Sequence, residues 1–186
     1  MNKKLPRGQY ETRDMPIMYL YPFPAMDMKK WKLKITGLVD KEVSLSLAEL
    51  KKLGTCEYTK DIHCVTTWSK LGVKWRGIPL KKILDYIKPK NDWRFLIQHS
   101  VDGYTTNIPR KDIEGEEVFI AYEMDGKPIS REHGYIRIII PHLYGWKSAK
   151  YLTTLEFAKS DKPGFWEERG YHNHGRVDQE ERVWGD

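Results

Sequence analysis

At residues 63–69 the sequence reads His-Cys-Val-Thr-Thr-Trp-Ser, where a predicted strand gives way to a loop rich in hydroxyl and aromatic side chains. Residues 57–63 have the composition of a strand, which delivers Cys64 to its end. A thiolate at such a junction can be a nucleophile or a soft ligand for a thiophilic metal. Burial as a small hydrophobic residue is the alternative, because free cysteine is among the most buried residue types. Cys56 fits that alternative better, since nothing polar clusters around it in the sequence.

Strand patterns dominate on both sides of this stretch. Residues 31–37 alternate apolar and polar side chains, as a half-buried strand does. Asp125-Gly126 is typical of a tight turn. Further strands are expected at residues 93–99, 104–108, 117–123, 135–140 and 151–158. Because strands outnumber helices and the turns are irregularly spaced, the sequence predicts a mixed, β-rich α+β fold rather than a repeating βαβ sheet.

Two short helices are also expected. Ser46 and Glu49 have the spacing of a capping box, and Gly54 suits the end of that helix. A second helix has Pro79 in its first turn and ends before Pro89.

The length of 186 residues fits one domain of ordinary size. We expect a single domain over residues 1–186, with the proline-rich residues 1–30 as an extended arm laid over it. There is no run of 18 apolar residues, and no apolar segment follows the basic start of the chain. We therefore expect no integral membrane segment and a cytoplasmic location, or an exported protein if a leader has been removed.

The charge balance favours an anionic partner. Lys and Arg number 32 against 26 Asp and Glu, a net charge of +6. Nucleic acid, an anionic membrane surface or a phosphorylated cofactor would each fit this excess. No run of five or six like charges is present, unlike in nucleic-acid-binding tails.

The histidines leave a zinc site open as an alternative. Cys64, His63, His99 and the pair His172 and His174 could assemble one, but no HExxH or CxxC spacing supports it.

A loop with glycine followed by basic residues comes after the apolar strand at 135–140. Residues 145–150 read Gly-Trp-Lys-Ser-Ala-Lys, and such a loop can wrap a phosphate with backbone N–H groups and lysine charge. Arg137 lies inside the apolar strand, where an outward position or an anionic partner would explain it.

Taken together, these segments resemble the molybdopterin-binding domain of the sulfite oxidase family. The resemblance is collinear from about residue 19 to 182. It rests on residues 63–69, 75–80, 102–104, 108–109, 121–129, 132–134, 137, 141, 144–150 and 164–172.

The resemblance implies a molybdenum ion bound by one molybdopterin and by the thiolate of Cys64. Soft sulfur ligation suits such a centre, and the cofactor would carry the redox chemistry. Tyr171 corresponds to the active-site tyrosine of sulfite oxidases, where a phenol can donate a hydrogen bond or relay a proton. The residues implied to bind the pterin or its phosphate are Tyr19, Leu20, Tyr21, Pro22, His99, His133, Arg137, Ser148, Ala149 and Lys150.

Two departures from the family bear on the substrate. Sulfite oxidases surround their anion with arginines, but the corresponding positions here are Met18 in the arm and Ser69 after the metal cysteine, with only Lys70 adjacent. A dianion site is expected to keep bidentate arginines. The sequence therefore predicts oxygen-atom transfer on a small neutral molecule such as an S-oxide or N-oxide rather than on sulfite.

The resemblance also bears on partners. The chain has neither the dimerisation domain nor the haem domain of larger sulfite oxidases, so we expect a monomer that exchanges electrons with a separate protein or carrier. A zinc hydrolase that uses Cys64 and histidines is one alternative function. A basic nucleic-acid-binding module is another, although its aromatics are not interleaved with Lys and Arg on one element.

Overall fold

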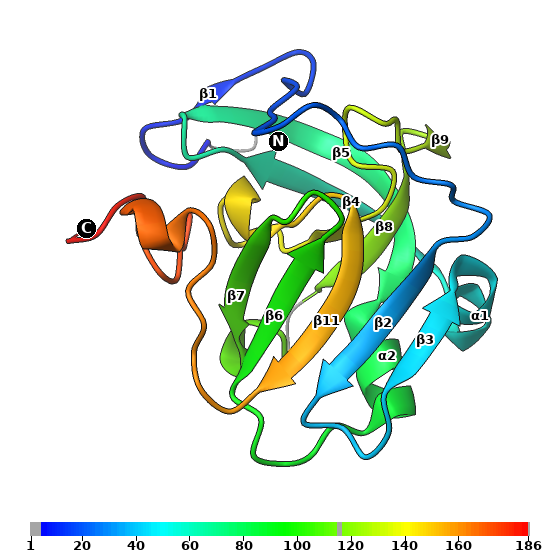
Figure 1. The fold of residues 1–186 in the computed structure, drawn as a ribbon. Helices are drawn as coiled ribbons and strands as arrows, with labels where there is room; N and C mark the ends of the chain where they lie inside the picture. The colour runs from blue at the N-terminus through cyan, green and yellow to red at the C-terminus, as the bar shows by residue number, and fades with distance from the viewer. Residues whose placement is uncertain (1–4, 115–116, 186) are drawn as a thin grey trace.

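The computed structural model describes residues 5–114 and 117–185, so residues 1–4 of the predicted arm lie outside it. In this part of the chain, two β-sheets pack across a shared core (Figure 1). The first sheet is built on a long antiparallel hairpin of β4 (Cys56–His63) and β5 (Trp68–Pro79). Its other strands are β8 (Phe119–Met124), β10 (Arg137–Ile139), β1 (Tyr10–Glu11) and β9 (Lys127–Pro128).

The second sheet supplies the opposite wall of the core. Its strands, in spatial order, are β3 (Val43–Ser46), β2 (Lys32–Gly37), β11 (Leu152–Ala158), β6 (Phe95–Ser100) and β7 (Thr105–Pro109). Strands β2 and β11 run parallel and the other neighbours antiparallel. Leu33 and Ile35 of β2 are fully buried against a cluster that also contains Ile120 and Ile138 of the first sheet. The alternating pattern of residues 31–37 thus places apolar side chains in the core.

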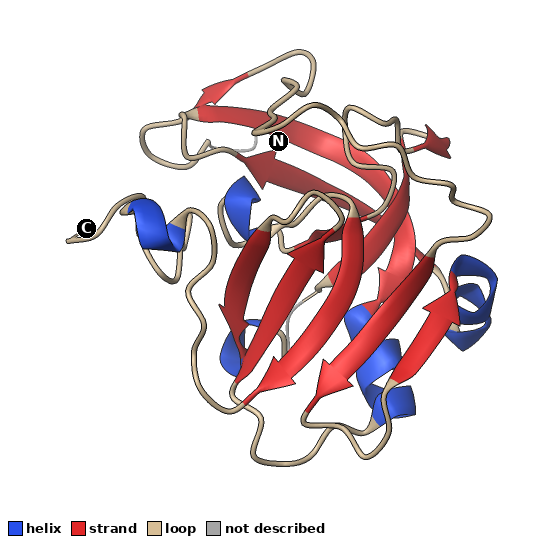
Figure 2. Ribbon diagram, viewed as in Figure 1, coloured by secondary structure: helices blue, strands red, loops and turns tan. Residues whose placement is uncertain are grey.

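Figure 2 shows the two α-helices beside the sheets. α1 (Leu47–Leu53) begins with the predicted capping box, in which Ser46 Oγ accepts from Glu49 N at 3.3 Å and Glu49 Oε2 accepts from Ser46 N at 2.8 Å. α2 (Leu80–Ile87) follows β5 directly, and short 3₁₀ helices are η1 (Arg110–Asp112), η2 (Gly145–Lys147) and η3 (Glu167–Arg169). No helix of the described residues is long and apolar enough to cross a membrane. The α+β class is confirmed.

The sequence pattern missed strand β5 and placed Pro79 inside the following helix. In the structure Pro79 is the last residue of β5, because Gly77 and Pro79 pair with Ala121 and Phe119 of β8. A Cβ on Gly77 would lie 2.5 Å from the carbonyl oxygen of Ile120, so this close approach requires glycine. Gly77 therefore serves a strand pairing, and Pro79 both ends β5 and is the N-cap residue of α2.

Candidate molybdopterin site

Cys64 lies in the turn that closes the hairpin of β4 and β5. Its N–H donates to the carbonyl of Trp68 at 2.8 Å, and its own carbonyl accepts from Thr67 N at 3.0 Å. Thr67 has a φ of 80°, a strained value for a β-branched residue. The arm reinforces the turn, because Gln9 Nε2 donates to the Cys64 carbonyl at 3.1 Å. The thiol is therefore held on a tightly constrained turn, with its Sγ 3.1 Å from Thr66 Oγ1.

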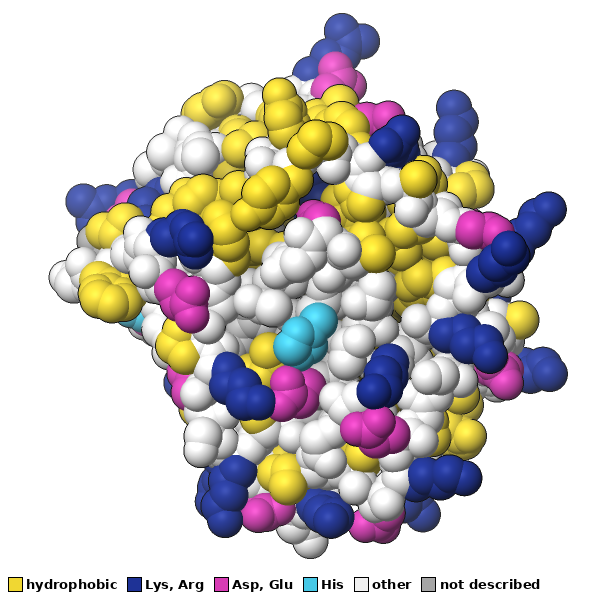
Figure 3. Space-filling view, in the orientation of Figure 1, with side chains coloured by type: hydrophobic (Ala, Val, Ile, Leu, Met, Phe, Trp, Pro, Cys, Tyr) yellow, Lys and Arg dark blue, Asp and Glu magenta, His cyan; other side chains and the backbone are white. Residues whose placement is uncertain are grey.

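A cavity of about 170 Å³ opens over this turn. The arm forms one wall with Tyr19, Leu20 and Tyr21, while Pro22 is not among the lining residues. Figure 3 shows hydrophobic side chains gathered over the upper part of the molecule, where Figure 1 places the arm. The predicted site residues on the other walls are Cys64, His133, Arg137, Ser148, Lys150 and Tyr171. Segments far apart in the sequence thus meet around one thiol.

Three basic side chains line the cavity without a matching set of carboxylates. Burial lowers the pKa of Arg137 to about 10, and no carboxylate of the described residues pairs with it. Burial together with Arg137 lowers the pKa of Lys150 to about 7. The same causes, with Lys150, lower the pKa of His133. Mutual repulsion between the buried Arg137 and the partly buried Lys150 and His133 is what an anionic ligand would relieve.

Buried side-chain nitrogens at this end of the cavity lack hydrogen-bond partners among the described residues. Arg137 Nε and His133 Nδ1 are buried and have no hydrogen-bond partner among the described residues. The other side of the guanidinium is fixed, because Arg137 Nη2 donates to the carbonyl of Ser148 at 3.1 Å. Unpaired buried donors are rare in folded proteins and mark a position for a ligand or water. The arrangement fits an anion such as a phosphate.

Residues 145–150 are fixed from the second sheet. The side chain of the buried Gln98 donates to the Lys147 carbonyl at 2.7 Å and accepts from Ala149 N at 3.0 Å. Ser148 Oγ accepts from Ile140 N at 3.1 Å. Ser148 and Lys150 line the cavity, whereas the Ala149 side chain packs in the core. We name residues 145–150 the cofactor loop.

Two basic residues lie elsewhere than the sequence suggested. His99 does not line the cavity, and its Nε2 is 3.0 Å from Glu156 Oε2. The structure therefore does not bring His99 to the predicted pterin site. Lys147, which sequence reasoning grouped with the phosphate-binding lysines, forms a buried ion pair with Glu167 at 2.6 Å instead. A loop pattern of glycine and lysine does not reveal which lysine faces inward.

Tyr171 lies in an aromatic wall of the cavity. Its ring stacks on Trp166 with centroids 4.7 Å apart and meets the edge of Trp146 at 5.1 Å. Burial and the nearby Cys64 raise the pKa of the Tyr171 phenol. The phenol therefore keeps its proton at neutral pH and can donate it in a hydrogen bond.

Sequence reasoning did not assign Asp102 or Trp166 to the site, although both line the cavity. Asp102 Oδ1 accepts from Tyr104 N at 3.2 Å, and its charge raises the pKa of Lys150. Both residues lie in segments that carry the family resemblance. Only the fold shows that their side chains reach the cavity.

The structure does not assemble the alternative zinc site. No group of three or more His, Cys, Asp or Glu among the described residues could hold a metal ion. His174 Nε2 lies 2.7 Å from Asp112 Oδ2, and His172 Nδ1 lies 3.4 Å from Glu181 Oε2. These histidines belong to a cluster with carboxylates rather than to a site with Cys64.

Comparison with known proteins agrees with this geometry. Residues 20–166 match the family described as oxidoreductase molybdopterin binding domain. The chain belongs to this family. The oxidoreductase YuiH of Bacillus subtilis (strain 168) is 39% identical over 185 residues, which cover 98% of this chain and 93% of that protein. The protein-methionine-sulfoxide reductase catalytic subunit MsrP of Campylobacter jejuni is 27% identical over 165 residues, 79% of this chain and 55% of MsrP.

A solved structure shows the same fold. The sulfane dehydrogenase SoxCD from Paracoccus pantotrophus superimposes with a TM-score of 0.70 at 17% identity, covering 88% of this chain and 46% of that chain. The family resemblance read from the sequence is confirmed, and the chain is an oxidoreductase of the sulfite oxidase type. The cavity fits the family's molybdopterin, because it offers a phosphate the guanidinium of Arg137, which pairs with no carboxylate of the described residues, and offers a soft metal the Cys64 thiol.

Proposed function

We propose that this chain carries a molybdenum ion on the Cys64 thiolate, bound through molybdopterin in the cavity, and transfers an oxygen atom to or from a small neutral molecule. The observation that carries the proposal is one cavity lined by the Cys64 thiol, the cations Arg137 and Lys150, and the phenol of Tyr171. When bound, the cofactor would supply two-electron redox chemistry.

The cationic side chains would bind and orient the cofactor through its phosphate. Arg137 Nε is free to donate, and its guanidinium is already oriented by the Ser148 carbonyl. A phosphate would also raise the pKa of Lys150 from about 7 toward its ordinary value, so Lys150 would bind it as an ammonium. The Nδ1 of His133, which also lines the cavity, could donate a further hydrogen bond in the tautomer that carries a proton there. Charge-assisted hydrogen bonds of this kind are among the strong ones in proteins.

Tyr171 would act on the substrate. Its Oη stays protonated and can donate to an S-oxide or N-oxide oxygen, which becomes more negative as its bond to sulfur or nitrogen weakens. The stacked Trp166 and the edge of Trp146 fix the ring and exclude water from one side. Tyr171 is thus the residue that we assign to catalysis together with Cys64.

The cavity favours a neutral substrate. Met18 lines the mouth where sulfite oxidases carry an arginine. Ser69 is fully buried, with its Oγ 2.7 Å from His63 Nδ1, so it does not contact a ligand either. The basic side chains that line the cavity, Arg137, Lys150 and His133, are already assigned to the cofactor, so none is left for an anionic substrate. The name of the relative MsrP, a protein-methionine-sulfoxide reductase, agrees with an S-oxide substrate.

We also propose a separate electron carrier. The relatives from Azospira oryzae and Campylobacter jejuni are named as subunits of methionine-sulfoxide reductases, which supports a division of labour between electron supply and substrate chemistry.

The test of the substrate class is a rapid-mixing experiment on the cofactor-loaded protein. Reduced enzyme should be reoxidised by S-oxides or N-oxides at micromolar to millimolar concentrations. Fast reduction of the oxidised enzyme by low concentrations of sulfite, without reoxidation by the oxides, would overturn the proposed substrate class. Stoichiometric zinc without pterin would instead favour the hydrolase alternative.

A further inference from the structure

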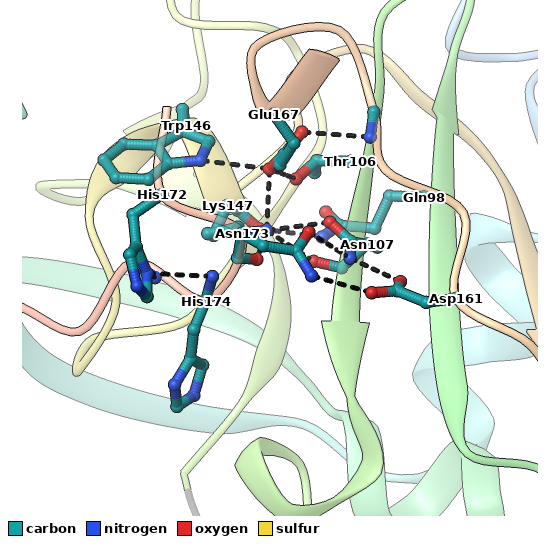
Figure 4. Close-up of polar contacts among 12 residues, drawn as sticks. Gln98, Thr106, Asn107, Trp146, Lys147, Asp161, Glu167, His172, Asn173 and His174 are labelled. Atoms are coloured by element: carbon teal, nitrogen blue, oxygen red, sulfur yellow. Dashed lines mark hydrogen bonds and ion pairs between the residues drawn. The ribbon is translucent and has the colours of Figure 1, made fainter. Parts of the chain in front are cut away.

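Lys147 lies in the cofactor loop, but its ammonium does not line the cavity and enters a buried polar cluster instead (Figure 4). The side chain of Lys147 is 0% exposed and that of Glu167 is 1% exposed. Lys147 Nζ lies 2.6 Å from Glu167 Oε1, 2.8 Å from Asn107 Oδ1 and 2.5 Å from the carbonyl oxygen of Asn173. One charge thus joins the cofactor loop to β7 and to the C-terminal segment.

The carboxylate of Glu167 is equally well satisfied. Its Oε1 accepts from Thr106 Oγ1 at 2.8 Å and from Trp146 Nε1 at 3.0 Å, and its Oε2 accepts from Gly164 N at 3.1 Å. A Cβ on Gly164 would lie 2.2 Å from the carbonyl oxygen of Thr105, so the segment can approach β7 this closely only with glycine there. These contacts hold Glu167 in place at the start of residues 167–173.

Two of the three residues that the Lys147 ammonium contacts lie on either side of Tyr171 in the sequence. Glu167 precedes Tyr171 and Asn173 follows it. The Asn173 side chain is held as well, because its Nδ2 donates to Asp161 Oδ2 at 2.7 Å. Between these anchors, Tyr171 N donates to the carbonyl of Trp166 at 3.0 Å. A shift of the Tyr171 backbone would therefore strain contacts that converge on one ammonium.

Stability alone does not account for this pair. Hydrophobic residues of similar volume often replace a buried ion pair without loss of stability or with a gain. A fully satisfied polar network instead fixes one geometry, since its hydrogen bonds are directional. We propose that Lys147 is a positioning residue for Tyr171, fixing the phenol relative to the cofactor loop by holding both ends of residues 167–173. This inference rests on the role that we propose for Tyr171.

The backbone of the cofactor loop is held by other residues, so the role of the Lys147 ammonium can be tested separately. Gln98 holds the backbone of the loop at Lys147 and Ala149, and Arg137 contacts the Ser148 carbonyl. None of these contacts uses the Lys147 ammonium. Removing that ammonium should therefore misplace Tyr171 while the chain still binds molybdopterin.

The first experiment measures hydrogen–deuterium exchange in the purified protein and its Lys147→Met variant. Amides in residues 164–174 should exchange at least about tenfold faster in the variant, and those of β11 should not change. Lys159→Met removes an exposed ammonium 3.4 Å from Asp92 Oδ2 and is the control. Unchanged protection of residues 164–174 would overturn the inference. If Lys147→Met does not fold, Glu167→Gln, which keeps the shape of the side chain, replaces it in both experiments.

The second experiment is a double-mutant cycle with Tyr171→Phe, scored by kcat and by pterin content. Lys147→Met should keep the pterin, lower kcat more than it raises KM, and cause little further loss in the Tyr171→Phe background. Independent losses that multiply in the double variant would contradict a positioning role. If Tyr171→Phe leaves kcat unchanged, the proposed role of Tyr171 fails, and the exchange experiment then decides whether Lys147 fixes the segment.

Discussion

Lys150 and Arg137 line the same cavity, and burial with the Arg137 charge lowers the pKa of Lys150 to about 7. Neighbouring cations of this kind cost free energy unless an anion binds between them. Asp102 is the carboxylate in the lining that partly offsets this repulsion. The pair is therefore arranged for a ligand rather than for the stability of the chain by itself.

Replacing Arg137 should separate cofactor binding from stability. In Arg137→Met, the cofactor-free protein should be more stable to unfolding by about 1–3 kcal/mol, because an uncompensated buried charge is removed. The same variant should retain far less pterin, because the phosphate loses its main partner. Thermal unfolding and pterin fluorescence check the two effects. A less stable variant that retains its pterin would contradict this assignment of Arg137.

The pH dependence of the cofactor-free protein should report on Lys150. The pKa of Lys150 is about 7 in the folded chain and 10.5 as its ordinary value, so between these pH values the unfolded state binds more protons. Stability should therefore rise with pH across this window through Lys150. The Lys150→Met variant should lose that contribution, whereas the surface variant Lys159→Met should retain it. Equal slopes of unfolding temperature against pH in Lys150→Met and the parent protein would contradict the lowered pKa of Lys150.

Two histidine variants form a matched pair. His133 lines the cavity, and His99 pairs with Glu156 outside it. His133→Ala should lower pterin content, whereas His99→Ala should leave it within error of the parent protein. Measured pterin per chain decides between the cavity and the sequence-based assignment of His99. If only His99→Ala loses pterin, the sequence-based assignment of His99 to the pterin site is correct.

Asp112 should contribute to acid stability. Burial alone would raise its pKa, but the nearby His142, 3.4 Å away, and the hydrogen bond from His174 hold the pKa well below the ordinary value of 3.8. The stabilisation is present above 3.8 and is lost as the pH falls below it. Asp112→Asn should reduce the free energy of unfolding at neutral pH by about 1–3 kcal/mol. It should also make the free energy of unfolding fall less steeply below about pH 4. If stability in the variant falls with decreasing pH as steeply as in the parent protein, Asp112 is not the source of the acid dependence.

The sequence predicted the elements whose patterns are local. The capping box of Ser46 and Glu49 and the alternation in β2 follow from neighbouring residues, so they could be read directly. Strand β5 could not, because Gly77 and Pro79 are explained only by pairing with β8. A strand whose residues are explained only by a partner far away in the sequence cannot be predicted from a local pattern.

The site divides in the same way. Cys64 was found from its place at a strand end, and Arg137 from its contrast with an apolar strand. Nothing local distinguishes Lys147 from Lys150, and distant polar groups, chiefly the buried carboxylate of Glu167, hold the Lys147 ammonium away from the cavity. His99 was assigned by resemblance, but β6 places its side chain next to Glu156 on β11.

The most direct test of the account is the molybdenum and pterin content of protein made in a host that synthesises the cofactor. Cys56 is exposed outside the cavity, so the expectation that it is the buried cysteine was wrong. The parent protein and Cys56→Ser should each hold about one molybdenum and one pterin per chain. Cys64→Ser should lose most of its molybdenum, because its thiolate is the proposed protein ligand. Full molybdenum in Cys64→Ser, or a parent protein that cannot be loaded with molybdenum at all, would contradict the account.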